Sequence, residues 1–142
     1  MRIMEFPFHI QLTPFSCSAA VYQTVVRALT GSPVGHWQAM HEIGTTMFSG
    51  TSDYEFMAAC NRRGLAVKDL GCRVDEWDDV LKAGGIVVTC DNVNYRRSHC
   101  IAVVGYTNGN KWVVADPLRV FRLVTPSDLV RQATDAFAVK VG

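Results

Sequence analysis

The sequence predicts an α+β domain in which helices come first and an antiparallel sheet follows. Apolar residues recur at helical spacing over the first 64 positions, and from residue 65 onward short segments rich in β-branched and aromatic residues replace them. Asn108-Gly109 separates two of these segments and is a strong hairpin signal. The chain has 142 residues, 49% of them hydrophobic, which is enough for a single domain over 1–142 with a substantial core.

Three helices are expected in the first half. The first begins at Cys17, after Ser16 as a candidate N-cap, and is closed by Gly31. The second covers about 33–43. The third begins near residue 52 and ends at Gly64, since glycine is favoured just beyond a helix C-terminus.

The second half is expected to form a meander of antiparallel strands. The strand-like segments are 65–70, 86–90, 99–107, 111–116, 120–124 and 136–141, with short helices over 74–85 and 125–133. If Asn108 and Gly109 alone form the turn, Ile101 faces Asp116. His99 and Asp116 are then diagonal neighbours on one face of the sheet, because two steps along a strand preserve the face.

Composition argues against several classes of function. The formal net charge is +1 and the two arginine pairs are short and separate, so we expect no nucleic-acid partner. No apolar run reaches about 18 residues, and the N-terminus does not resemble a signal peptide, so we expect no membrane association and a cytoplasmic location. The five cysteines contain no CxxC pair and the four histidines show no zinc spacing, so reduced thiols and no metal or other cofactor are expected.

A candidate nucleophile lies at the start of the first predicted helix. Taken alone, Cys17 is most simply a buried thiol, because cysteines beside alanines in an amphipathic helix usually belong to the core. His99 and Asp116 change this interpretation, because an imidazole and a helix N-terminus both favour the reactive thiolate and a carboxylate orients the ring. Gln11, six residues before the cysteine, could donate a hydrogen bond to a developing oxyanion, together with the Cys17 backbone N–H.

These residues resemble the papain-like cysteine peptidases of the C39 type. The resemblance consists of Gln11, Cys17 six positions later, "SHCIAVVGY" and "WVVADP", and it extends over nearly the whole chain. It implies a papain-like fold, with an N-terminal helical lobe packed on a C-terminal antiparallel sheet. It also implies Cys17 as nucleophile, His99 as general base and acid, Asp116 as orienting carboxylate and Gln11 as oxyanion-hole donor, with no cofactor.

The resemblance implies hydrolysis of peptide or isopeptide bonds in a peptide or protein substrate. Two alternatives stay open at this stage. The same triad could deamidate or transamidate a protein glutamine, since all these reactions pass through an acyl-enzyme, and the fold could also bind peptides without cutting them. The resemblance also implies cleavage after a Gly-Gly-type leader. Ser16 and Ser18 replace the Asp and Gly that usually flank the cysteine, and these replacements bear on that specificity. Asp91 and Asn92 are fallback candidates for the third member of the triad.

Overall fold

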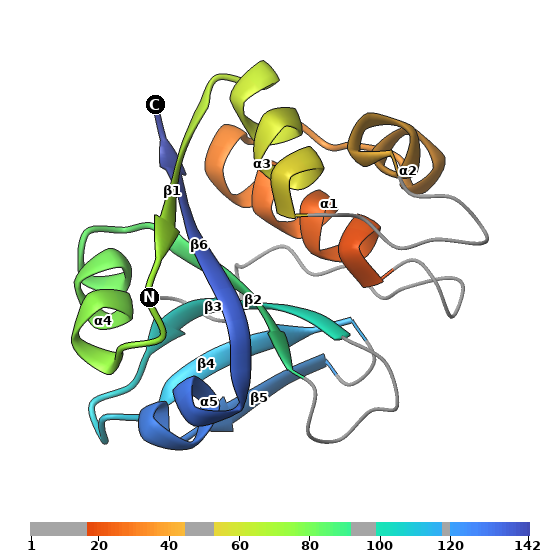
Figure 1. The fold of residues 1–142 in the computed structure, drawn as a ribbon. Coiled ribbons are helices and arrows are strands. Elements are labelled where there is room, and N and C mark those ends of the chain that lie inside the picture. The colour runs from red at the N-terminus through yellow and green to blue at the C-terminus, as the bar shows by residue number, and fades with distance from the viewer. Residues whose placement is uncertain (1–16, 45–52, 92–98, 118–119) are drawn as a thin grey trace.

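The computed structural model describes residues 17–44, 53–91, 99–117 and 120–142. Its helices are α1 (Cys17–Thr30), α2 (His36–Ile43), α3 (Asp53–Arg62), α4 (Val74–Lys82) and α5 (Pro126–Gln132). Its strands are β1 (Leu65–Leu70), β2 (Ile86–Asp91), β3 (His99–Tyr106), β4 (Trp112–Asp116), β5 (Val120–Val124) and β6 (Ala133–Val141). Figure 1 shows how they are arranged.

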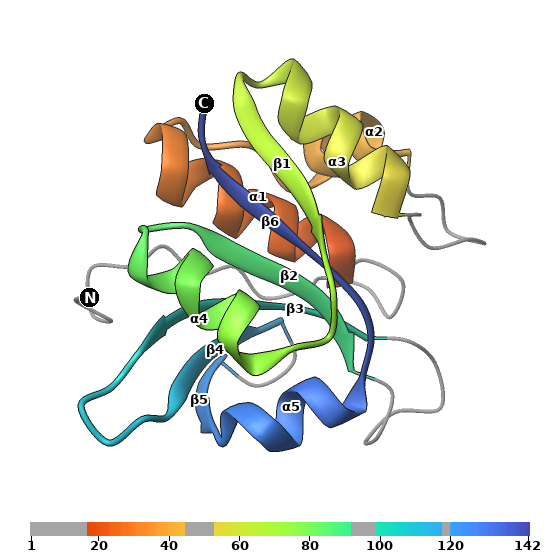
Figure 2. The ribbon, with the colours of Figure 1, turned by 60° about the vertical axis from the view of Figure 1, so that its left-hand side comes forward.

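The strands form one antiparallel sheet in the order β1-β6-β2-β3-β4-β5. Strands β2 to β5 are the expected meander. The expectation of a meander throughout is wrong at β6, which returns to lie between β1 and β2. The helices between strands explain this, because α4 separates β1 from β2 and α5 carries the chain back across the sheet, as Figure 2 shows.

Helices cover both faces of the sheet and create two cores. On one face, α1 and α3 pack on the sheet and α2 packs on these two helices, and the fully buried Val25, Val26 and Ile43 belong to this helical-lobe cluster. On the other face, α4 and α5 cover a second cluster, in which Trp77 stacks on Trp112 with ring centroids 5.6 Å apart. Helices first and sheet second is therefore confirmed, with two short helices on the face of the sheet opposite the first three (Figures 1 and 2).

The predicted C-terminal ends of the three early helices agree with the structure, whereas the start of the second helix differs. Gly31 follows α1 with φ 76° and Gly64 follows α3 with φ 81°, in the left-handed region that glycine adopts readily. The second helix begins at His36 and not near residue 33, because Gly35 has extended backbone and serves as its N-cap. No described helix is long and apolar enough to cross a membrane.

The β3–β4 turn is longer than predicted. The backbone N–H of Thr107 donates to the Lys111 carbonyl at 2.9 Å, so three residues, 108–110, form the loop. Asn110 takes a left-handed φ of 60°, as the last residue of such a loop commonly does. The expectation that Asn108 and Gly109 alone form the turn is therefore wrong.

A bulge in β3 cancels the effect of the longer turn. Next to the turn, Gly105 pairs with Val113, one position away from the predicted register. The register shifts between Val103 and Gly105, and beyond it Ala102 pairs with Ala115, as the two-residue turn would have given. The predicted register is therefore recovered at the end of the hairpin that carries His99 and Asp116.

Candidate active site

Cys17 is the first residue of α1. Its side chain is partly buried and packs against the helical-lobe cluster. The position gives the sulfur two useful properties, because backbone N–H groups of a first helical turn have no intrahelical partner and the positive end of the helix dipole favours an anion. The thiol is therefore partly exposed at the end of the helix where a negative charge is favoured.

His99 is the first residue of β3, at the end of the sheet near α1. The structure describes its position in the strand but not its side chain. The next residue, Cys100, is buried in the helical-lobe cluster, so the strand begins against the same core that Cys17 contacts. Figures 1 and 2 both draw the first turn of α1 beside the end of the sheet where β3 begins.

Asp116 is the last residue of β4 and is completely buried. Its Oδ2 accepts a hydrogen bond from Nε of Arg122 at 3.3 Å, and the arginine side chain is only 23% exposed. The pairing of β4 with β5 explains the contact. Asp116 pairs with Val120 and Val114 pairs with Arg122, so the carboxylate and the guanidinium are diagonal neighbours on one face of the hairpin.

The strand pattern assigns Asp116 and Cys17 to different sides of the sheet. Along β4, Val113 and Ala115 face the helical lobe, whereas Val114 faces α4. Asp116 continues this alternation on the α4 side, together with Arg122. A catalytic contact between the thiol and groups on this hairpin has to be made around the end of the sheet, where β3 begins, β4 ends and the first turn of α1 lies.

Of the other residues that the sequence suggested for the site, most lie outside the described part of the chain. Gln11, the predicted oxyanion donor, lies outside the described residues, as do the fallback Asn92 and the predicted N-cap Ser16. Asp91 ends β2 and pairs with His99 in the sheet, although its side chain is not described. Among the described residues, no three metal-binding side chains are grouped as a metal site would require.

Cys17 differs from the other described thiols in its surroundings. Cys60 is fully buried in the helical-lobe cluster, and burial raises its pKa to about 12, which keeps it protonated and unreactive at neutral pH. Cys100 is also buried. Cys72 is exposed, with its Sγ 3.8 Å from the Ala133 carbonyl oxygen. Cys17 is thus the described thiol that joins partial exposure to a helix N-terminus.

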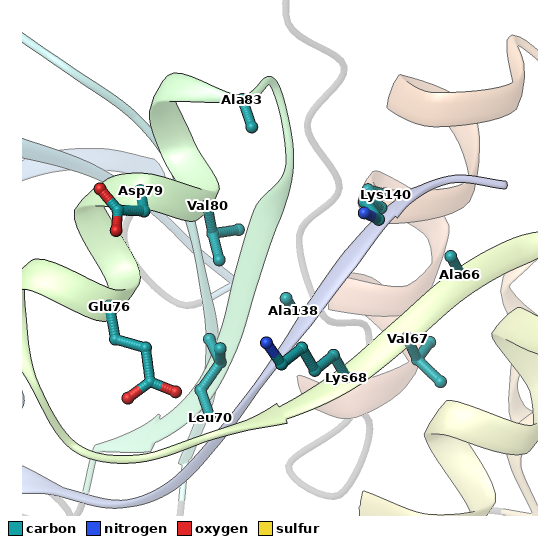
Figure 3. Close-up of a pocket in the computed structure, with 10 residues that line it drawn as sticks. All are labelled: Ala66, Val67, Lys68, Leu70, Glu76, Asp79, Val80, Ala83, Ala138 and Lys140. Carbon is teal, nitrogen blue, oxygen red and sulfur yellow. The ribbon is translucent and has the colours of Figure 1, made fainter.

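A groove on the α4 side of the sheet is lined by other residues than Cys17 and Asp116. It runs between α4 and strands β1 and β6, holds about 280 Å³, and is drawn in Figure 3. Lys68 and Lys140 come from the strands, and Glu76 comes from the helix opposite. Among the described residues of the predicted site, neither Cys17 nor Asp116 lines this groove.

Solved structures of peptidase domains resemble this chain closely in fold. The peptidase domain of Streptococcus ComA, a bi-functional ABC transporter involved in quorum sensing, has a TM-score of 0.78 with 16% identity over 97% of this chain and 100% of that one. A double glycine motif protease from an AMS/PCAT transporter, solved in complex with the leader peptide, has a TM-score of 0.76 with 17% identity over 96% and 91%. The N-terminal peptidase C39-like domain of a Vibrio parahaemolyticus toxin secretion ATP-binding protein has a TM-score of 0.61 with 13% identity over 93% and 100%.

No protein-family model matches the sequence, and no curated protein is similar to it. The likeness to the solved structures nevertheless extends over nearly all of each chain. The protein therefore has the papain-like fold of C39 peptidase domains, as its residue pattern predicted.

Proposed function

We propose that the protein is a cysteine peptidase in which Cys17 is the nucleophile. The observation that carries the proposal is the position of this thiol, partly exposed at the first residue of α1, in a fold shared with C39 peptidase domains. Cysteine nucleophiles need the thiolate form, and a helix N-terminus stabilises it. We assign His99 as general base and acid, Asp116 as the carboxylate that orients the imidazole, and Gln11 as an oxyanion donor.

The chemistry proceeds by acyl transfer. The His99 imidazole takes the thiol proton and the sulfur of Cys17 attacks the substrate carbonyl carbon. The negative oxygen that forms accepts hydrogen bonds from the Gln11 amide and the Cys17 backbone N–H. The imidazolium returns its proton to the leaving amine as the peptide bond breaks, which leaves a thioester. A water molecule, deprotonated by the imidazole, then attacks the thioester carbonyl and releases the free acid and the thiol.

Peptide hydrolysis is preferred over the other outcomes of an acyl-enzyme because the neighbouring folds are peptidases. One of them was solved with a leader peptide. We therefore expect a peptide substrate for this chain as well. Deamidation of a protein glutamine would use the same residues and differ only in the acyl donor, and a binding module of the same fold would retain peptides without changing them.

The test is incubation with a diverse peptide library, read by mass spectrometry. Wild type should generate new peptide termini, and Cys17→Ala and His99→Ala should generate none. Cys72→Ala is the matched control, because it removes an exposed cysteine outside the proposed site and should keep full activity. Conversion of glutamine to glutamate without cleavage would identify a deamidase. Peptide retention without any chemistry would identify a binding module and contradict the proposal.

A further inference from the structure

We infer that Arg122 is a positioning residue for the proposed active site, acting through Asp116. The inference rests on the proposed function. It starts from a contact that the sequence analysis did not find, the hydrogen bond from Arg122 Nε to Asp116 Oδ2 at 3.3 Å. No role for Arg122 follows from the residue pattern alone, because the arginine lies six positions beyond the carboxylate and on the next strand.

The burial of the Asp116 carboxylate supports this role of Arg122. Asp116 has no exposed surface. An ionised carboxylate that is removed from water needs a countercharge or several hydrogen-bond donors, because otherwise it takes up a proton. Arg122 supplies a permanent positive charge, since a guanidinium does not lose its proton in proteins. The arginine thereby keeps Asp116 in the charged form that an orienting carboxylate requires.

The geometry of the β4–β5 hairpin also supports this role of Arg122. The β4–β5 register holds Arg122 in place, because its strand position is opposite Val114 and diagonal to Asp116. A carboxylate has two oxygens and can accept from two groups at once. In our proposal Arg122 holds Oδ2 and fixes the plane of the carboxylate, and the imidazole N–H of His99 donates to the same group. A carboxylate fixed in this way presents the ring at one orientation to the sulfur of Cys17.

The Asp116–Arg122 pair is more deeply buried than a typical surface salt bridge. The Asp116 side chain is 0% exposed and the Arg122 side chain 23% exposed, whereas both side chains of the Arg131–Asp128 pair are more than half exposed. Exposed pairs contribute little, but removal of one partner of a buried pair leaves an uncompensated charge. Arg131 therefore offers a matched control, as an arginine paired with an aspartate in solvent.

The test measures the alkylation rate of Cys17 by iodoacetamide, resolved by peptide mass spectrometry, at pH 5.5 and pH 8. In Arg122→Gln the buried carboxylate should lose its charge as the pH falls, so the imidazolium loses its partner and the thiolate is less populated. We expect the rate at pH 5.5 to fall about tenfold and the rate at pH 8 to change little. Arg122→Lys should restore most of the rate at pH 5.5, and Arg131→Gln should match wild type at both pH values.

A double-mutant cycle with Asp116→Asn separates positioning from general stability. If Arg122 acts through Asp116, Arg122→Gln should have no further effect in the Asp116→Asn background. An Arg122→Gln variant with wild-type rates, an equal loss at both pH values, or the same additional loss in the Asp116→Asn background would each overturn the inference. Thermal unfolding of every variant checks that it is folded at the assay temperature.

The controls distinguish this inference from the proposed function. If wild-type Cys17 reacts no faster than Cys72 and Asp116→Asn changes nothing, the proposed function fails and the role of Arg122 fails with it. If Cys17 reacts fast and depends on His99 and Asp116, while Arg122→Gln equals wild type, only the role of Arg122 fails.

Discussion

A pair of carboxyl groups beside the helical lobe predicts that one substitution stabilises the protein in a pH-dependent way. Asp53 begins α3 and its carboxyl group interacts with that of Asp135 in β6. Burial, the hydrogen bond to Asp135, and the charges of Asp135 and then Asp69 raise the pKa of Asp53 from 3.8 to about 7. We predict that Asp135→Asn stabilises the protein at pH 8 and has little effect at pH 4.

The sign follows from proton linkage. A folded-state pKa above the unfolded value means that the folded protein holds the proton more tightly, so stability falls as the pH rises from about 4 to about 7. The full shift corresponds to about 4 kcal/mol at 1.36 kcal/mol per unit. Because Asp53 is only half-buried, solvent screening reduces this to about 2 kcal/mol. Burial is the largest cause and remains in the variant, so Asp135→Asn should recover about 1 kcal/mol above pH 7.

Urea unfolding at pH 4 and pH 8 measures this difference, and a gain of about 1 kcal/mol would raise the melting temperature by about 3 °C. Asp69→Asn should give a smaller gain with the same pH dependence, because Asp69 is the last of the causes. Asp79→Asn, an exposed carboxylate on α4, is the control and should give none. Equal stability changes for Asp135→Asn at both pH values, or a loss at pH 8, would refute the reasoning.

Two further predictions concern the helical lobe and its connection to the sheet. Tyr22→Phe should lower the free energy of unfolding in urea by about 1–2 kcal/mol, because the buried hydroxyl donates to Glu42 Oε1 at 2.7 Å. The loss is limited to this bond, because Arg63 still satisfies the Glu42 carboxylate in the variant. An unchanged midpoint would show that the bond contributes nothing. Gly64→Ala should cost about 1 kcal/mol, because φ is 81° although the space around the position is open. Gly109→Ala is its control, because its φ lies outside the left-handed region and an added Cβ would meet Thr107 Oγ1 at an ordinary 3.8 Å; a loss as large as that of Gly64→Ala would contradict the backbone explanation.

Much of the fold follows from local patterns in the sequence. Strand β1 matches the predicted 65–70, and Gly31 and Gly64 mark helix ends because few other residues tolerate positive φ. The position of β6 could not be predicted in this way. Nothing in its own residues specifies which strands it joins, since that choice depends on the path that α5 gives the chain and on the two cores, one on each face of the sheet, to which β6 contributes.

The hairpin shows how a correct register can follow from an incorrect turn. Asn108-Gly109 favours a two-residue turn, but Asn110 also tolerates a left-handed conformation and lengthens the loop by one residue. The compensating bulge near Val104 is marked in the sequence only by Gly105, an isolated glycine inside a strand segment, which does not by itself indicate how the register shifts. It follows from the need to keep Ala102 and Ala115 buried on the helical-lobe face, which fixes the register wherever one face is apolar.

For the candidate site, the sequence predicted the positions of two residues in their helix and strand, and their catalytic roles stay a prediction. Cys17 at a helix start and Asp116 at a strand end are found where the sequence analysis expected them. Arg122 was missed because its contact depends on the β4–β5 register across a turn. Its signal was an arginine within a predicted strand of otherwise apolar residues, "VFRLV", that directly follows the Asp-Pro segment.

The reactivity of Cys17 tests the central claim most directly, because it requires no knowledge of the substrate. Alkylation at pH 6 should be at least about tenfold faster at Cys17 than at the exposed Cys72, and His99→Ala should abolish the difference. Equal rates at the two thiols, or a fast Cys17 that is indifferent to His99, would contradict a thiolate–imidazolium pair at the end of the sheet.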